Sequence, residues 1–381
     1  MKLVLFFSRG VSLKLWIEKG IFDREKLLYE EHLKQNNLYK VYWLTYGYND
    51  EDIAKELKKN NKLHHNIEVL QMPKIFCIPK IGTYLYSLYV PFIYRNILKD
   101  SDIFKTNQTD GSWSAVIAKK LYDKKLLYRT GFTMSQLENK LKRFNVIARK
   151  AIEWFEEIAY KNCDKAIVAS SHNLEYVKEK YKVINDKADI IYNFIDRKSF
   201  YDFYENREDK VVFIGRLSDE KNIYNLILAL NNLNLPLEIY GSGPLKNGIA
   251  TFIKKNNYNV RLMGNVSNNQ LPQILNKVKY FTLVSKHEGM PKALIEGMAC
   301  GCLCVGTDVT GINEVIVNNH GILAKDISSK EITNAFKKIM SLSKQEIADM
   351  KLNVKYFIDQ NFTLEYVVKK ERKIFKELSA K

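Results

Sequence analysis

The chain has 381 residues, of which 46% are hydrophobic and 27% are charged, a composition that fits two or three globular domains and excludes disordered, collagen-like and low-complexity proteins. Lys and Arg outnumber Asp and Glu by 60 to 43, and residues 1–200 hold +11 of the net charge of +17. Such a basic first half suits nucleic acid, an anionic membrane or a phosphorylated substrate, although codon bias alone would also produce it.

No segment has the length of a membrane-spanning helix. The strongest candidate, the uncharged residues 81–94, is interrupted by Pro91 and falls short of the ~20 apolar residues that a span needs. The apolar run at residues 3–7 is too short for a secretory signal, and the five cysteines lack the spacing of a zinc site. We therefore expect a cytoplasmic protein. Because the sequence contains no nucleic-acid-binding motif, we expect no nucleic acid partner.

Strands and helices alternate along the whole chain. Short apolar runs predict strands at residues 2–7, 39–45, 102–106, 126–128, 165–169, 211–214, 237–240, 280–284 and 303–306, and the segments between them predict helices at 24–34, 52–60, 136–160, 171–181, 223–233 and 293–299. Repeated strand–helix units indicate parallel sheets covered by helices on both faces. We expect two doubly wound, Rossmann-like α/β domains that face each other across a cleft. The expected limits are 1–195 for the first domain, 196–210 for a charged linker, 211–360 for the second domain, and 361–381 for a final helix that crosses back to the first.

Ligands of such sheets bind beyond the carboxyl ends of the strands, and the first informative residues occur there. Gly215 and Arg216 directly follow a predicted strand, and Lys221 lies at the start of the next helix. Glycine permits a tight turn or the close approach of a ligand, and arginine binds a phosphate through two hydrogen bonds. A lysine near a helix N-terminus is unfavourable by itself, so a bound anion would explain Lys221; a solvated surface lysine is the simpler alternative.

The segment from His287 to Glu296 has the most specific pattern. It follows a predicted strand, and Gly289 and Pro291 shape a loop that opens a helix. The free N–H groups of the first helical turn can bind hydroxyl or phosphate oxygens. Glu288 precedes the helix and Glu296 lies inside it, so two carboxylates are available for hydroxyl groups at the two ends of one ligand. A chance pair of surface carboxylates is the alternative, and the small apolar residues around Glu296 argue against it.

These segments together resemble the retaining glycosyltransferases of family 4, which have the GT-B fold. The Glu-x7-Glu pattern at Glu288 and Glu296 is the strongest match. Further matches are Gly215-Arg216-Leu217 with Lys221, Gly241-x-Gly243-Pro244, residues 260–266, residues 307–311 with Glu314, residues 191–196, and Ser8-Arg9-Gly10. The resemblance covers essentially the whole chain and is stronger in residues 210–320 than in residues 1–190.

The resemblance implies a role for each matched residue. Arg216 and Lys221 neutralise the diphosphate of a nucleotide-sugar donor, Glu296 accepts hydrogen bonds from its ribose hydroxyls, and Glu288 holds the donor sugar; Arg216, Lys221 and Glu288 form the catalytic set. The remaining donor-binding residues are Arg261, Met263 and Gly264 at the nucleotide base, Gly10 at the diphosphate from the first domain, and Gly215, Gly289, Met290, Pro291, Lys292, Ala293 and Leu294. Because the departing nucleoside diphosphate gains charge as the glycosidic bond breaks, preset cations stabilise the transition state.

One departure from the family concerns a histidine that many members carry in a first-domain loop near the donor sugar. The matching stretch, residues 128–132, contains no histidine. On the first-domain side we expect the cleft to be lined by Asn107, Gln108, Asp110, Thr130 and Gly131. No residue is assigned as the general base.

Two weaker patterns have ordinary explanations beside the functional ones. Asp50-Glu51-Asp52 has the Asp-x-Asp form that holds metal in other glycosyltransferase folds, but it precedes a helix, whose first turn favours acidic residues. We therefore expect no metal and no other cofactor, since the nucleotide sugar is a substrate. The tyrosine-rich residues 84–94 and the basic residues between Lys140 and Lys150 suit an anionic membrane surface, or equally a packed helix with a solvated face.

The sequence thus predicts a cytoplasmic glycosyltransferase that lies on the inner face of the membrane if its basic surface binds lipid. It would move a sugar from a nucleotide-sugar donor to a glycan or lipid-linked acceptor, with retention, in cell-surface polysaccharide or glycoconjugate biosynthesis. The alternatives are a nucleotide-sugar epimerase or a phosphorylase on the same scaffold, and an inactive protein that binds glycans or membranes. No lysine is marked for the pyridoxal phosphate that a phosphorylase would use.

Overall fold

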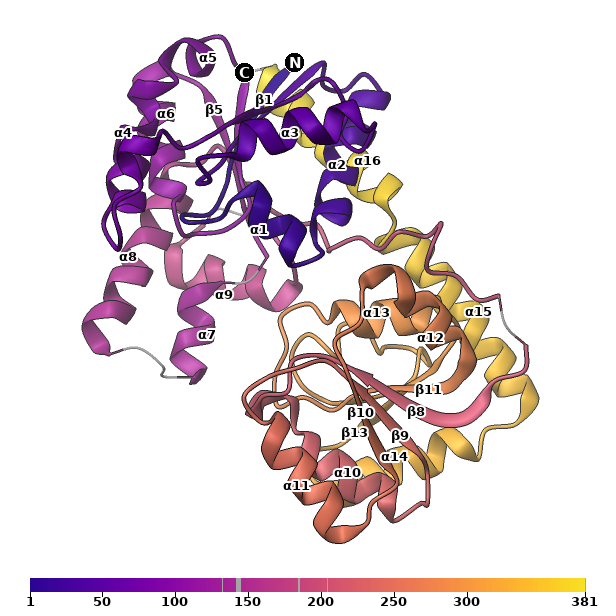
Figure 1. Cartoon of the computed structure of the whole chain (residues 1–381). Helices are drawn as coiled ribbons and strands as arrows, with labels where there is room; N and C mark the ends of the chain where they lie inside the picture. The colour runs from indigo at the N-terminus through magenta and orange to yellow at the C-terminus, as the bar shows by residue number, and fades with distance from the viewer. Residues whose placement is uncertain (132, 142–144, 184–185, 204, 381) are drawn as a thin grey trace. The chain divides into compact units, whose positions relative to one another are not determined.

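The computed structural model describes residues 1–131, 133–141, 145–183, 186–203 and 205–380. The chain forms two compact units: unit 1 contains Met1–Tyr192 and Val367–Lys381, and unit 2 contains Asn193–Tyr366 (Figure 1). The segment expected as a linker, residues 196–210, falls within unit 2, and its last three residues already belong to a strand.

Unit 1 contains a seven-stranded parallel sheet in the order β3-β2-β1-β4-β5-β6-β7. Its strands are β1 (Lys2–Phe6), β2 (Lys40–Leu44), β3 (Ile67–Leu70), β4 (Ile103–Thr106), β5 (Lys125–Thr130), β6 (Lys165–Val168) and β7 (Ala188–Ile190). Its helices are α1 (Leu13–Glu18), α2 (Phe22–Lys34), α3 (Asp50–Lys59), the 3-10 helix η1 (Lys74–Phe76), α4 (Gly82–Ile93), α5 (Arg95–Lys99), α6 (Ser112–Tyr122), α7 (Met134–Leu141), α8 (Val146–Asn162) and α9 (Ser171–Tyr181). Every side chain of β4 is buried, as expected for a strand covered on both faces of a parallel sheet.

Unit 2 contains a six-stranded parallel sheet in the order β10-β9-β8-β11-β12-β13. Its strands are β8 (Glu208–Ile214), β9 (Leu237–Tyr240), β10 (Val260–Gly264), β11 (Val278–Leu283), β12 (Leu303–Thr307) and β13 (Ile322–Ala324). Its helices are η2 (Asp219–Lys221), α10 (Ile223–Asn231), α11 (Lys246–Asn256), η3 (Asn268–Gln270), α12 (Leu271–Lys277), α13 (Lys292–Ala299), α14 (Ser329–Met340) and α15 (Lys344–Asn361), and α16 (Leu364–Ser379) continues from unit 2 into unit 1.

A buried ionic cluster holds α16 within unit 1. Glu371 accepts hydrogen bonds from Lys105 Nζ at 2.7 and 2.8 Å, and its other contact is His32 Nε2 at 3.2 Å. Burial alone would raise the pKa of Glu371, but the charge of Lys105 and the hydrogen bond to His32 lower it well below the ordinary carboxyl value. In Figure 1, α16 accordingly lies beside the indigo elements of unit 1.

The prediction of a single helix at residues 136–160 is wrong, because two helices, α7 and α8, occupy this region. Asn145 begins the second of them: its Oδ1 accepts a hydrogen bond from the Ala148 N–H at 2.9 Å. Asparagine is a favoured N-cap, and its side chain competes with a continuous helix. Residues 142–144, part of the predicted basic helix, lie outside the described residues.

Candidate functional site

The order of strands in unit 2 indicates where a ligand binds. From β8 the chain adds β9 and β10 on one side and then returns to add β11, β12 and β13 on the other. Ligands of open parallel sheets bind beyond the carboxyl ends of the two strands at such a reversal. The loops that follow β8 and β11 begin at Gly215 and Val284, so both motifs singled out in the sequence belong to this reversal point.

Two glycines pack the loop after β9 against the loop after β8. The Leu217 N–H donates to Ser242 O at 3.0 Å, and the Leu245 N–H donates to Leu217 O at the same distance. A Cβ on Gly243 would lie 2.4 Å from Leu217 O, and Gly241 has a φ of +135°. The Gly-x-Gly pattern therefore fixes the backbone of the loop after β8.

Arg216 extends from this fixed loop with an exposed side chain. Among the residues that the structure describes, none forms an ion pair or hydrogen bond with its guanidinium group. Lys286, an exposed cation in the loop after β11, is instead paired with Asp219 at 2.7 Å. Arg216 is therefore an uncompensated positive charge directly beyond the end of β8.

The Lys221 side chain crosses the reversal point to Glu288. Its Cε would lie 3.9 Å from a Cβ on Gly215, and its Nζ lies 2.5 Å from Glu288 Oε1. Ser285 Oγ donates to the same carboxylate oxygen at 2.7 Å. The side chains of Lys221 and Glu288 are only 17% and 12% exposed. The structure thus brings together two residues that the sequence assigned separately to the diphosphate and the sugar.

The loop after β12 supports the backbone around Glu288. The Glu288 N–H donates to Thr310 O at 3.2 Å. Gly311, with a φ of +84°, lies so close that a Cβ there would be 2.5 Å from Gly289 O. Met290, which follows Gly289 in this loop, is half-buried. Close approach by a glycine therefore explains the matched segment at residues 307–311.

The first turn of α13 follows this loop. Pro291 is its N-cap residue, and no side chain in the described part of the chain caps it. The first N–H groups of α13 and the positive end of the helix dipole are thus the groups that an anion would contact here. Glu296 lies one turn further on, is 4% exposed, and has Lys292 Nζ at 3.5 Å from Oε1. Leu294 is fully buried, and its N–H donates to Pro291 O at 3.0 Å.

The residues expected at the nucleotide base lie on β10, an edge strand of the sheet. Arg261 and Met263 are exposed, and Gly264, with a φ of +76°, ends the strand and accepts a hydrogen bond from the Gly241 N–H at 2.8 Å. Two strand spacings, about 10 Å, separate β10 from β8. Met263 and Gly264 therefore share the carboxyl edge with the reversal point, whereas Arg261 lies further back along the strand.

Unit 1 has its own reversal point, between β1 and β4. Gly10, after β1, has a φ of +76°, which favours glycine. Arg9 binds Asp110 through two hydrogen bonds of 2.9 and 3.0 Å, and its guanidinium carbon lies 3.8 Å from the centroid of the Tyr84 ring. Burial raises the pKa of Asp110, and the charge of Arg9 opposes this. The sequence analysis matched Ser8-Arg9-Gly10 but assigned Arg9 no role, although an arginine beside a glycine after a strand was the pattern that identified Arg216.

The loops after β4 and β5 lie against each other. Gln108 Nε2 would be 3.0 Å from a Cβ on Gly131, and Asn107 is half-buried. Thr130 was expected to line the cleft, but it is 1% exposed and its hydroxyl lies 3.4 Å from Tyr160 Oη. Its side chain therefore belongs to the core of unit 1, because β5 extends through it. Residue 132 lies outside the described residues.

The buried carboxylate of Glu156, which the sequence analysis did not single out, holds these loops in place through hydrogen bonds. Glu156 on α8 accepts hydrogen bonds from Thr109 Oγ1 at 3.2 Å, the Met134 N–H at 2.7 Å and Tyr181 Oη at 2.8 Å. Burial raises the pKa of Glu156, although hydrogen bonds from Ser135 and Tyr181 act in the opposite direction. Glu156 therefore connects the loop after β4 to the first turn of α7.

The Asp-x-Asp run contributes to the N-termini of two helices, α1 and α3. Asp50 is buried and accepts hydrogen bonds from the N–H groups of Leu13 at 2.8 Å and Lys14 at 3.3 Å, so it caps α1 as well as beginning α3. Asp52 pairs with Lys55 at 2.9 Å. In the described parts of the chain, no group of three or more His, Cys, Asp or Glu side chains is arranged to hold a metal ion. Nor does any helix there combine the length and apolarity needed to cross a bilayer.

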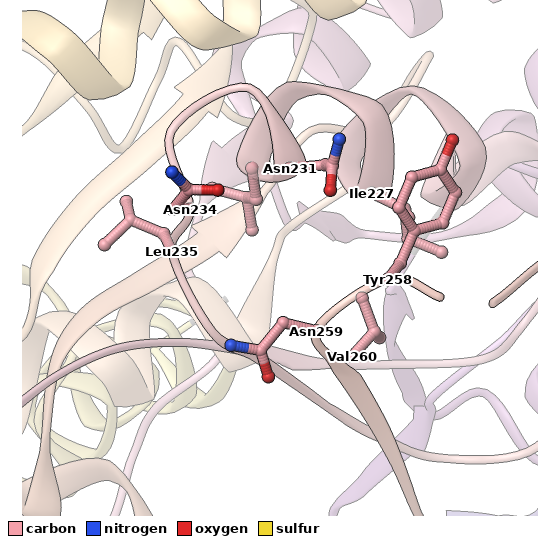
Figure 2. Close-up of a pocket in the computed structure, with 8 residues that line it drawn as sticks. Ile227, Asn231, Asn234, Leu235, Tyr258, Asn259 and Val260 are labelled. Carbon is pink, nitrogen blue, oxygen red and sulfur yellow. The ribbon is translucent and has the colours of Figure 1, made fainter. Parts of the chain in front are cut away.

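Unit 2 also contains a pocket, whose lining residues are drawn in Figure 2. It lies at the ends of the strands opposite to those that form the reversal point. It is lined by Ile227, Leu230, Asn231, Asn234, Leu235, Tyr258, Asn259 and Val260. Leu235 and Asn259 precede β9 and β10, so the pocket lies at the amino ends of these strands. It is therefore separate from the candidate site at the carboxyl ends.

Sequence comparison identifies relatives along most of the chain. Residues 30–199 match the model of Glycosyltransferase Family 4, and residues 197–355 match Glycosyl transferases group 1. An uncharacterized glycosyltransferase of Methanocaldococcus jannaschii is 26% identical, with 86% of this chain and 88% of the relative covered. A Campylobacter jejuni protein, 26% identical over 65% of this chain and 71% of its own, is named N-acetylgalactosamine-N,N'-diacetylbacillosaminyl-diphospho-undecaprenol 4-alpha-N-acetylgalactosaminyltransferase.

Solved structures share the fold over nearly the whole chain. A glycosyltransferase of Rickettsia africae has a TM-score of 0.75 at 18% identity, with 99% of this chain and 98% of the other covered. An Anabaena protein in complex with UDP and glucose has a TM-score of 0.73 at 16% identity, with 98% and 99% covered. The two parallel-sheet units and these neighbours confirm the expected GT-B fold. With both halves matched by family models and the fold shared throughout, the chain belongs to the family-4 glycosyltransferases of the GT-B fold.

Proposed function

We propose that the protein transfers a sugar from a nucleotide-sugar donor to a glycan acceptor, with retention at the anomeric carbon, and binds the donor at the reversal point of unit 2. The observation that supports this most is the convergence of Arg216, the Lys221–Glu288 pair and the uncapped start of α13 at the ends of β8 and β11. Two cations and a helix N-terminus suit a diphosphate, and a fixed carboxylate suits sugar hydroxyls.

The chemistry of this arrangement is stabilisation of the leaving group. When the bond between the anomeric carbon and the diphosphate oxygen breaks, that oxygen gains negative charge. Arg216 and Lys221 supply the compensating charge, and Lys221 needs little reorganisation because Glu288 already holds it. Each protein group aimed at the leaving oxygen in this way raises the rate of bond cleavage by about 10²–10³-fold.

We further propose that the acceptor is a glycan carried on a lipid, as in cell-surface polysaccharide or glycoconjugate biosynthesis. The support comes from the Campylobacter jejuni relative, whose name describes a diphospho-undecaprenol acceptor. In unit 1, the loops beyond β1, β4 and β5 offer Arg9, Gln108 and Asp110 at the carboxyl edge of the sheet. These loops are the proposed acceptor side.

The test is acceptor-dependent release of nucleotide from a panel of UDP-, GDP- and ADP-sugars. UDP-sugars come first because the Anabaena structure contains UDP and glucose. Arg216→Ala should lower turnover by about 100-fold or more, whereas Lys337→Ala, an exposed cation on α14, should not. Release from no donor, or full activity in Arg216→Ala, would contradict the proposal. Isomerisation of the donor without acceptor would identify an epimerase instead.

A further inference from the structure

The segment from η1 through α4 presents an exposed apolar face. Its exposed large side chains are Ile75, Ile78, Ile81, Tyr84, Leu85, Leu88, Tyr89, Phe92 and Ile93, which we call the α4 surface. They are nine of the 23 large apolar side chains that are exposed among the described residues, yet they come from one short segment. Exposed apolar residues are normally scattered, so a concentration of this kind marks an interaction site.

Helical spacing gathers the α4 surface on one side of a firmly held helix. Its members at 81, 84, 85, 88, 89 and 92 follow the i, i+3, i+4 spacing of one helix face. The opposite side packs on α6 (Figure 1): Trp113 Nε1 donates to Ser87 Oγ at 2.9 Å, and Tyr122 Oη donates to Pro91 O at 2.7 Å. Tyr86 is fully buried, and its ring contacts those of Tyr46 and Phe76. The helix is therefore apolar on its solvent side as well as on its packed side.

Every charged residue in the stretch of chain from Lys74 to Lys99, which contains the α4 surface, is positive. Residues 81–94 contain no Asp, Glu, Lys or Arg. Lys74, Lys80, Arg95 and Lys99, on either side of this stretch, are all exposed. An apolar, tyrosine-containing face with cations at both ends complements an anionic bilayer, because the apolar side chains enter the acyl boundary while the cations meet lipid phosphates.

A second copy of the chain is a poorer partner for this face. A two-fold interface brings the same patch of both copies together. The cations of the two copies would then surround one apolar contact to which residues 74–99 bring no acidic side chain, which is unfavourable. Charge complementarity therefore favours the bilayer.

We infer that unit 1 docks on an anionic membrane through the α4 surface, and that the acceptor is an amphiphile taken from that membrane. The statement about the acceptor rests on the proposed function; the docking does not. This inference assigns lipid contact to α4 instead of the basic residues between Lys140 and Lys150. Of the two segments that the sequence suggested for a membrane surface, it therefore keeps the tyrosine-rich residues 84–94.

The α4 surface is joined to the proposed acceptor loops. Tyr84, one of its members, lies with its ring centroid 3.8 Å from the Arg9 guanidinium carbon, and Thr83 Oγ1 lies 3.5 Å from Arg9 Nη1. Arg9 is held in turn by Asp110 in the loop after β4. A polar group at the bilayer surface would thus lie beside the carboxyl edge of the unit 1 sheet.

The test is flotation of the full chain with phosphatidylcholine vesicles that do or do not contain phosphatidylglycerol. The double variant Leu88→Glu/Phe92→Glu changes side chains that are 49% and 55% exposed. The control Leu352→Glu/Tyr356→Glu has the same spacing on α15 and exposures of 52% and 60%. We expect the α4 variant to lose about 100-fold or more in partition coefficient, because each large apolar side chain contributes about tenfold or more to membrane transfer, while the control binds like the parent.

A second variant, Lys80→Ala/Arg95→Ala, tests the charges separately from the apolar face. It should bind anionic vesicles more weakly, by about tenfold or more, and show less dependence on salt. Failure of the parent to bind anionic vesicles, or equal binding by parent and α4 variant, would overturn the inference. So would a parent dimer that the α4 variant converts to monomer without any vesicle binding. Vesicle binding is measured without donor, so failure of the proposed function would appear separately, as absence of nucleotide release.

Discussion

The contact between Lys221 and Glu288 predicts that substitutions at the two positions will not act independently. In Lys221→Met the carboxylate of Glu288, whose side chain is 12% exposed, keeps the hydrogen bond from Ser285 but loses its cation. It then adds negative charge where the donor diphosphate is proposed to bind. Removing the charge of Glu288 as well, in Lys221→Met/Glu288→Gln, should therefore restore part of the lost activity.

The size of this effect follows from the geometry of the pair. At the 2.5 Å separation and an effective dielectric constant of ~20, Coulomb's law gives ~6 kcal/mol before desolvation is subtracted. Measured couplings between contacting residues reach only ~3 kcal/mol. We therefore expect a coupling of ~1.5–3 kcal/mol, which makes the double variant ~10–150-fold more active than the product of the two single effects.

The assay is a double-mutant cycle on kcat/KM for nucleotide release, with nucleoside diphosphate affinity measured by titration calorimetry. The control is a second cycle on the neighbouring pair Lys286–Asp219, which has a similar separation of 2.7 Å but side chains 36% and 84% exposed. That exposed pair should couple by less than ~0.5 kcal/mol. If the effects at Lys221 and Glu288 add to within ~0.5 kcal/mol, the two residues do not act as a pair and the reasoning is refuted.

Four further results are expected. Glu296→Ala should weaken nucleoside diphosphate binding by ~1–3 kcal/mol in calorimetry; a lower melting temperature with unchanged affinity would show that Glu296 is only structural. Glu371→Gln should cost ~3–5 kcal/mol in urea unfolding at neutral pH because Lys105 is left buried and unpaired. Since the pKa of Glu371 is lower in the folded than in the unfolded chain, its stabilisation is present above the ordinary carboxyl pKa and is lost as the pH falls toward the folded value; a parent equally stable in acid would contradict this. Sugar transfer should survive excess EDTA because Arg216 and Lys221 supply the charge at the leaving group, and loss of activity that manganese restores would argue for a metal.

The elements that were predicted and those that were missed differ in how their residues are buried. Strands such as β1 and β12 are buried along all or nearly all of their length, so they appear in the sequence as short apolar runs. β10 was recognised only as a matched motif, because every second residue of this edge strand is exposed. β7 and β13 have three residues each, too few for a pattern. The break between α7 and α8 was missed because apolar spacing continues across it.

The sequence by itself determined the fold class and indicated the loops that form the candidate site. Parallel sheets bring the carboxyl ends of their strands to one edge, so residues directly after strands, such as Gly215 and Glu288, can be assigned to a common site without coordinates. Only the tertiary structure decided the partner of each charged side chain. The contacting residues are far apart in the sequence: Lys221 and Glu288 by 67 residues, Leu13 and Asp50 by 37, and Lys105 and Glu371 by 266. Periodicity reports whether a residue faces the core, but pairing depends on which loops and helices the strand order places side by side.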